Sequence, residues 1–110
     1  MAIYSNIIID QGSDFTTEIE VEDVTGNVAD LTGFSGAGQI RKTFASTTKT
    51  DFLTTISNPT TGKVKISLTS TITNSLKAGR YVYDVEVTSS SGVITRIVEG
   101  QVTITPGVTR

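Results

Sequence analysis

The sequence has no cysteine, no histidine and no tryptophan among its 110 residues, and only two prolines. Without cysteine and histidine the chain lacks disulfides, thiol nucleophiles, imidazole bases and the usual ligands of transition metals. Without tryptophan, its four phenylalanines and three tyrosines leave few side chains for stacking on a sugar. We therefore expect no catalytic activity, no cofactor, no bound metal and no small-molecule substrate.

Charge and long apolar runs are also scarce. Nine basic and eleven acidic residues give a formal net charge of −2, so the sequence predicts neither nucleic acid nor a membrane surface as a partner. The longest apolar run, Ile7-Ile8-Ile9, is far shorter than the ~20 residues that a membrane span needs. The first residues also lack the basic and apolar regions of a secretion signal. These features favour a soluble protein that is assembled in the cytoplasm.

What the sequence does contain is threonine and serine, 20 and 11 residues respectively, a composition that favours strands and turns over helices. A chain of 110 residues has room for one hydrophobic core. We expect one domain over residues 1–105, followed by a short C-terminal tail over residues 106–110.

Three segments alternate apolar and polar residues with the period of two that half-buried strands show. These segments are 15–22, 63–68 and 81–87. Less regular strands are expected in four further segments, 3–9, 34–42, 51–57 and 93–105, with Gly-, Asn- and Ser-rich turns between the strands.

One short helical turn is predicted near residues 70–76, with Ser70 as its cap, and it leads through Gly79 to Tyr81 at the start of a strand. This order is typical of the tyrosine corner, in which the phenol bonds to upstream backbone. We therefore predict an all-β fold, an immunoglobulin-like antiparallel β-sandwich of about seven strands. Its expected core comprises Phe15, Ile19, Val21, Ile40, Val64, Ile66, Leu68, Tyr83, Val85 and Val102.

Glycines cluster at Gly33, Gly36 and Gly38, shortly before Arg41. The spacing fits no phosphate-binding loop, because Gly38 is followed by Gln39 where a lysine would be needed. Gly36 and Gly38 instead leave a trough on one face of a strand, which a neighbouring aromatic side chain or another backbone can fill. If the trough faces outward it is a docking groove, so Gly36, Gly38 and Arg41 are the candidate protein interface.

Acidic residues gather along residues 18–23, where Glu18, Glu20, Glu22 and Asp23 follow one another closely. Carboxylates on one face of a strand lie about 7 Å apart, too far for one cation to collect them, so we interpret them as a solvated face that discourages edge pairing. Arg41, Arg80 and Arg96 are expected to form cross-strand pairs with Asp84, Glu86 or Glu99.

Several short motifs, in this order, make the sequence resemble a group of small tailed-bacteriophage virion proteins and the N-terminal domain of phage baseplate upper proteins. The motifs are Gln11-Gly12, Asp30-Leu31-Thr32-Gly33, Gln39-Ile40-Arg41, Ala78-Gly79-Arg80-Tyr81 and Glu99-Gly100-Gln101-Val102.

The resemblance implies an immunoglobulin-like virion structural protein, assembled in the host cytoplasm and located in the virion. Because the chain stops at Arg110 without a heptad stalk or head domain, the expected role is an adaptor that docks onto other tail or baseplate proteins. Two alternatives are open, a capsid or neck decoration protein and a host-side adhesion or carbohydrate-binding β-sandwich module. Expected partners are other virion proteins, with a homo-oligomer within the particle as an open question.

Overall fold

The computed structural model describes residues 3–22 and 26–108, and their secondary structure is almost entirely β. In chain order the elements of these residues are β1 (Ile3–Tyr4), β2 (Ile7–Asp10), β3 (Phe15–Glu20), β4 (Ser35–Arg41), β5 (Thr50–Asp51), β6 (Leu53–Asn58), the 3-10 helix η1 (Pro59–Thr61), β7 (Lys63–Leu68), α1 (Ser70–Ser75), β8 (Gly79–Thr88) and β9 (Ile94–Thr105).

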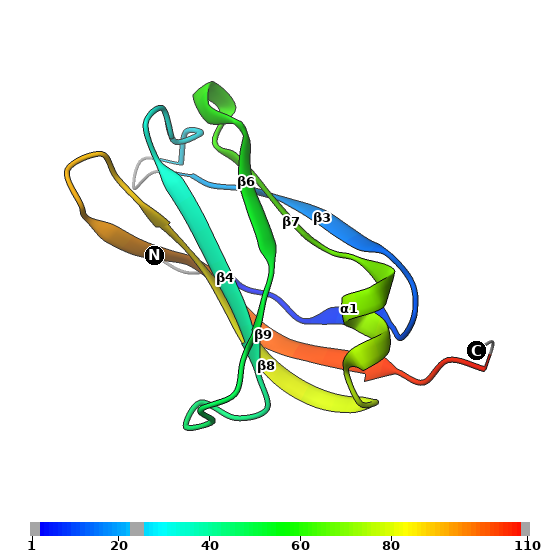
Figure 1. The fold of residues 1–110 in the computed structure, drawn as a ribbon. Coiled ribbons are helices and arrows are strands. Elements are labelled where there is room, and N and C mark those ends of the chain that lie inside the picture. The colour runs from blue at the N-terminus through cyan, green and yellow to red at the C-terminus, as the bar shows by residue number, and fades with distance from the viewer. Residues whose placement is uncertain (1–2, 23–25, 109–110) are drawn as a thin grey trace.

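The strands form two facing sheets (Figure 1). The larger sheet has the order β1-β9-β8-β4-β5, with β2 also on β9, and the smaller has the order β3-β7-β6. Successive strands cross between the sheets from β3 to β4 and from β7, through α1, to β8. This arrangement confirms the predicted immunoglobulin-like β-sandwich.

Two details of the sandwich differ from the prediction. The first strand is interrupted at Ser5 and Asn6, and both of its parts pair with β9 in parallel rather than antiparallel. The expected strand over 51–57 is divided as well, because the chain leaves β4 at Asp51 and joins β7 from Leu53 onward. These breaks give nine strands in the described residues where about seven were expected.

The side chains between the sheets largely match the predicted core. Seven of the ten expected residues are fully buried, whereas Phe15, Ile19 and Val21 are only half-buried. Phe15 and Ile19 lie on β3 and Val21 directly follows it, and β3 is at the edge of the smaller sheet with a neighbour on one side alone. Phe52 is buried beside Phe15 and Tyr83, with ring centroids 6.4 and 6.1 Å away.

The helical turn lies where the sequence predicts it, but its cap differs. Thr69, not Ser70, is the N-cap, and its hydroxyl accepts a hydrogen bond from Ile72 N. Thr73 is fully buried, and its hydroxyl donates to Ser13 O at 2.8 Å and accepts from Gly12 N at 3.1 Å. These bonds hold α1 against the turn that joins β2 to β3.

The tyrosine corner is confirmed. The Tyr81 hydroxyl donates to Lys77 O at 2.7 Å, inside the expected crossover, and the Lys42 ammonium lies 4.8 Å from the centre of the Tyr81 ring. A phenol bonded in this way fixes the start of β8 relative to α1.

A candidate docking face on the larger sheet

The glycine trough faces the interior, so the outward docking groove predicted from it is wrong. A Cβ atom on Gly38 would lie 3.1 Å from both Phe52 Cδ2 and Val85 Cγ2, and one on Gly36 would lie 2.7 Å from Thr54 Cγ2. The trough is therefore filled by the side chains of Phe52, which lies between β5 and β6, and of Thr54, which lies on β6. This is the other interpretation of the two glycines, in which a neighbouring aromatic occupies the space they leave.

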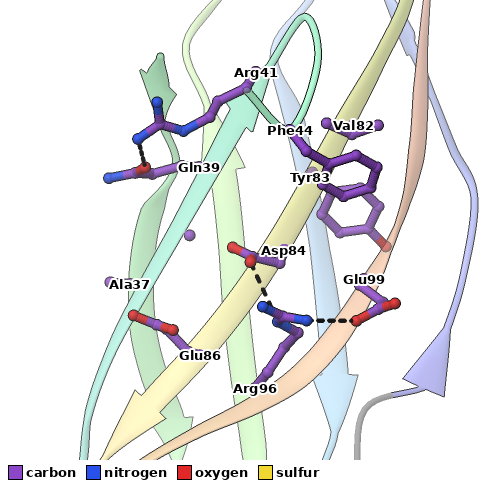
Figure 2. A pocket seen from close by; sticks show the side chains of 11 residues that line it. Ala37, Gln39, Arg41, Phe44, Val82, Tyr83, Asp84, Glu86, Arg96 and Glu99 are labelled. Carbon is purple, nitrogen blue, oxygen red and sulfur yellow. Dashed lines mark hydrogen bonds and ion pairs between the residues drawn. The ribbon is translucent and has the colours of Figure 1, made fainter. Parts of the chain in front are cut away.

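The opposite, outer surface of the same strands does carry a hollow, of about 370 Å³. Figure 2 shows side chains from three neighbouring strands around it, β4, β8 and β9. Arg41, one of the three candidate residues, contributes its side chain to the hollow, and Gly38 contributes backbone. The geometry thus keeps Arg41 at a surface and moves that surface to the outer face of the larger sheet.

Three charged side chains that line the hollow form a compact network. Arg96 Nε lies 3.3 Å from Asp84 Oδ2, and Arg96 Nη1 donates to Glu99 Oε2 at 3.0 Å (Figure 2). The hydrogen bond to Glu99 and the charge of Asp84 raise the pKa of Arg96 further above its ordinary value. The pair with Asp84 confirms the predicted cross-strand pairing of Arg96, whereas Glu99 lies on β9, the same strand as Arg96. Arg41 and Arg80 form no ion pair with a described carboxylate, contrary to the expectation.

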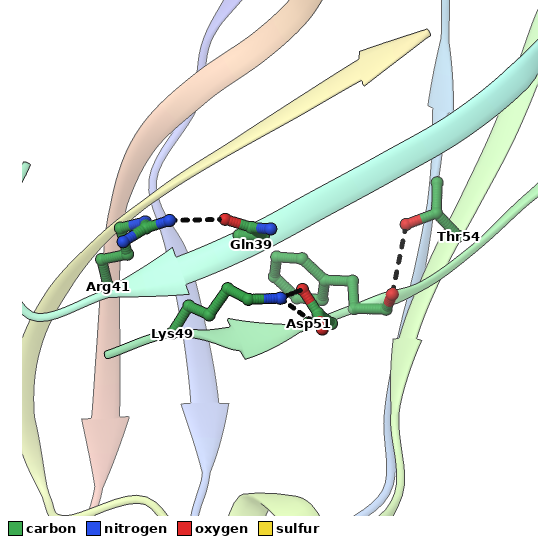
Figure 3. Close-up of polar contacts among 6 residues, drawn as sticks. Gln39, Arg41, Lys49, Asp51 and Thr54 are labelled. Carbon is green, nitrogen blue, oxygen red and sulfur yellow. Dashed lines mark hydrogen bonds and ion pairs between the residues drawn. The ribbon is translucent and has the colours of Figure 1, made fainter. Parts of the chain in front are cut away.

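Arg41 is instead held by neutral groups. Its guanidinium donates to Gln39 Oε1 at 3.1 Å (Figure 3) and also to the carbonyl of Ser46. The adjacent pair of Lys49 Nζ and Asp51 Oδ2, at 2.9 Å, continues the polar row onto β5. A guanidinium that is positioned but not neutralised can still accept a carboxylate from a partner.

Phe44 is the residue of this face that the sequence did not reveal. It lines the hollow from the loop between β4 and β5, and 88% of its surface is exposed. Sequence reasoning missed it because the loop shows no alternation that would assign an aromatic to a surface or to the core. An exposed aromatic beside arginines is the composition that protein interfaces favour.

The acidic face predicted on residues 18–23 is engaged with its own sheet. Glu20 Oε2 lies 3.3 Å from Lys63 Nζ, and Glu18 Oε2 accepts a hydrogen bond from Ser57 at 2.8 Å. Asp23 lies outside the described residues. In the described ranges no three acidic residues come together in a way that could hold a metal ion. No helix found among these residues is long and apolar enough to cross a membrane.

No family model matches the sequence, and no curated protein matches it. Among solved structures, the chain is similar at 15% identity and a TM-score of 0.46 to an internalin-like protein of Listeria monocytogenes, lmo2027, with 94% of this chain and 28% of that one covered.

A second similar chain comes from a structure that describes the basis of T cell specificity and activation by the bacterial superantigen toxic shock syndrome toxin-1. It has the same identity and TM-score, with 92% of this chain and 93% of that one covered. A family 123 glycoside hydrolase from Clostridium perfringens is 11% identical with a TM-score of 0.44, covering 97% and 24%. Such weak likenesses assign no function. The chain spans only about a quarter of the internalin-like protein and of the hydrolase.

Proposed function

We propose that this chain is a non-catalytic structural protein of a bacteriophage particle, an adaptor that docks onto other tail or baseplate proteins. The observation that carries the docking role is the outer face of β4, β8 and β9, where the exposed Phe44 and the unneutralised Arg41 lie around one hollow. Aromatic and arginine side chains in such a hollow are typical contact groups between proteins. The virion setting is supported by the sequence resemblance.

The particle itself tests the setting. Purified phage particles from cells that express the chain are analysed by quantitative mass spectrometry, and we expect the chain at a fixed, repeated copy number. Absence from the particles would contradict the virion role. A location on capsid or neck proteins, found by cross-linking, would select the decoration alternative.

Phe44→Ala tests the docking face. Truncating an interface aromatic weakens a contact by about 2 kcal/mol, or roughly 30-fold, so occupancy in the particle should fall while the melting temperature stays unchanged. Leu53→Ala is the matched control, since Leu53 is 67% exposed and lies on β6 in the other sheet. Equal occupancy of the two variants would remove the face from the proposal.

A carbohydrate-binding or adhesion role is the competing function. Its test is binding of the isolated chain to a glycan array over a range of protein concentrations. Saturable binding to a glycan that is lost in Phe44→Ala would favour a sugar-binding module over an adaptor.

A further inference from the structure

The smaller sheet has an open edge along β3. β3 pairs with β7 alone, in a register that runs from Phe15 opposite Leu68 to Glu20 opposite Lys63. The next residue continues this register, because Val21 N donates to Gly62 O at 2.7 Å. In Figure 1 β3 borders its sheet, with β7 between it and β6.

The register fixes which backbone groups of β3 are free. In an antiparallel pair, hydrogen-bonded and non-hydrogen-bonded residues alternate. Since Val21 bonds to the β7 side, residues 15, 17 and 19 do so as well, and Thr16, Glu18 and Glu20 direct their N–H and C=O groups away from β7. Among the described residues none of these six groups has a hydrogen-bond partner. A further strand can therefore pair along this edge.

Beside this edge of β3, apolar side chains between the two sheets are accessible from the surface. A groove of about 210 Å³ lies between β3 and the first two strands, with Ile3 and Ile7 on one wall and Ile19 on the other. Ile3 is 52% exposed, and Ile7 and Ile19 are half-buried. An added strand would place alternate side chains over this apolar surface.

The outward side chains of β3 decide which strand fits. Glu18 and Glu20 lie opposite Lys65 and Lys63 on β7, so the strand that β3 already accepts has lysines outward and apolar residues inward. A second copy of β3 would place glutamates opposite glutamates, which destabilises strand pairing. The acidic edge therefore disfavours self-pairing and admits a strand of opposite charge.

We propose that the open edge of β3 binds an extended segment of another protein by antiparallel strand addition. That segment carries apolar side chains at alternate positions, which enter the groove, and lysine or arginine at the positions between them, which meet Glu18 and Glu20. The inference does not depend on the virion setting, and it gives the chain a docking site separate from the Phe44 face.

The strand β7 supplies a probe with this pattern. A synthetic peptide with the sequence of residues 62–69, GKVKISLT, is titrated into the isotopically labelled chain, and GEVEISLT is the matched control. Peptide binding should shift the NMR resonances of the Thr16, Glu18 and Glu20 amides and should slow their hydrogen exchange. The amides of Thr17 and Ile19 should change little, because they already bond to β7. The basic peptide should bind about fourfold or more tightly than the acidic one.

Two variants sharpen the test. Glu18→Gln with Glu20→Gln should remove the preference for the basic peptide, while binding through the backbone is retained. Glu18→Pro should abolish binding of both peptides, since it removes a free N–H without removing a bond to β7. If this variant does not fold, the exchange pattern and the double variant still decide.

Three results would overturn the proposal. One is the absence of any change in these three amides at about 1 mM peptide, a weak affinity by the standard of protein contacts. Another is equal affinity for the basic and acidic peptides. The third is a concentration-dependent dimer in sedimentation that protects the β3 amides without peptide, which would make a second copy the occupant. A chain that binds the peptide and is absent from phage particles would refute the proposed function and leave this inference standing.

Discussion

Gly100→Ala should be among the most destabilising single-methyl additions in this protein. Gly100 lies in β9 opposite Tyr83 of β8. On its other side Gly100 contacts Ser5 and Asn6, the two residues that connect β1 to β2. A Cβ atom on Gly100 would overlap the carbonyl oxygen of Ser5 and lie 2.8 Å from Ser5 C. Because these atoms belong to the backbone, no side-chain rotation relieves the clash, and the segment at Ser5 and Asn6 must move away from β9.

The size of the effect follows from the hydrogen bonds that this movement breaks. Ser5 N donates to Glu99 O at 2.8 Å, the Tyr83 hydroxyl donates to Ser5 O at 2.6 Å, and Gln101 N donates to Asn6 Oδ1 at 3.0 Å. At about 1 kcal/mol each the loss is about 3 kcal/mol. Replacing a glycine in a strand returns up to about 1 kcal/mol, so the free energy of unfolding should fall by about 2 kcal/mol.

Urea denaturation of Gly100→Ala and Tyr83→Phe, analysed with a common m-value, measures this difference. Tyr83→Phe is the control that removes one of the three bonds, at a cost of about 1 kcal/mol, without displacing the backbone. Hydrogen exchange should show the Ser5 amide less protected in Gly100→Ala and nearly unchanged in Tyr83→Phe. If Gly100→Ala were no more destabilising than Tyr83→Phe, the close approach of β1 and β9 would not be as described.

Three further outcomes are expected. Tyr81→Phe should lower the free energy of unfolding by about 1 kcal/mol through loss of the bond to Lys77, and an unchanged urea midpoint would show that this bond contributes nothing. The space beside Gly38 is filled, so overpacking by Gly38→Gln should cost about 1–3 kcal/mol by the same assay, and native stability would disprove the inward orientation. Burial raises the pKa of Tyr83 above its ordinary value of 10.0, so the unfolded chain loses this proton at a lower pH than the folded chain. The stability that the Tyr83 hydroxyl contributes is therefore fully present below pH 10 and is lost as the pH rises through the higher pKa of the folded state. Thermal melts across that pH range should show this loss in the wild type, and the contribution should be missing in Tyr83→Phe.

The strands that the sequence predicted best are those with one face in the core. In 63–68 and 81–87 the alternation is visible because one face packs and the other meets water. The first strand has no such signal: Ile7, Ile8 and Ile9 are all apolar, although Ile9 is buried and Ile8 is 69% exposed. Its parallel pairing with β9 joins residues about 95 apart in the chain, and no local pattern encodes a partner at that separation.

The docking face could be predicted only in part, for a similar reason. Period two assigns Gly36 and Gly38 to one face of a strand, and Arg41 to the other, but does not say which face is inside. That depends on Phe52, a residue at the break between two strands, which fills the space above Gly38. The ion pair of Arg96 with Asp84 was accessible because one short turn joins β8 and β9 and brings their residues near each other, while Glu99 lies on the same strand as Arg96, three residues away.

The motifs that carry the resemblance to phage proteins have structural roles in this chain. Gln11 donates from its amide to Leu76 O at 2.8 Å and accepts from Gly107 N, which ties the end of α1 to the segment that follows β9. Asp30 Oδ1 accepts from Thr32 N and from its hydroxyl, bonds that lower the pKa of Asp30 and shape the turn before β4.

Two other motifs behave in the same way, with Tyr81 in the tyrosine corner and Gly100 packed against the backbone of Ser5. Residues that build turns and close approaches specify how a chain folds, and a fold serves many functions. Evidence for a partner must therefore come from the surfaces of the molecule rather than from the motifs alone. Phe44 on the outer face and the open edge of β3 are two such surfaces, and they belong to different sheets of the sandwich. The two proposed contact surfaces lie on different sheets, so a chain that uses both would bind two proteins at once, as the proposed adaptor role requires.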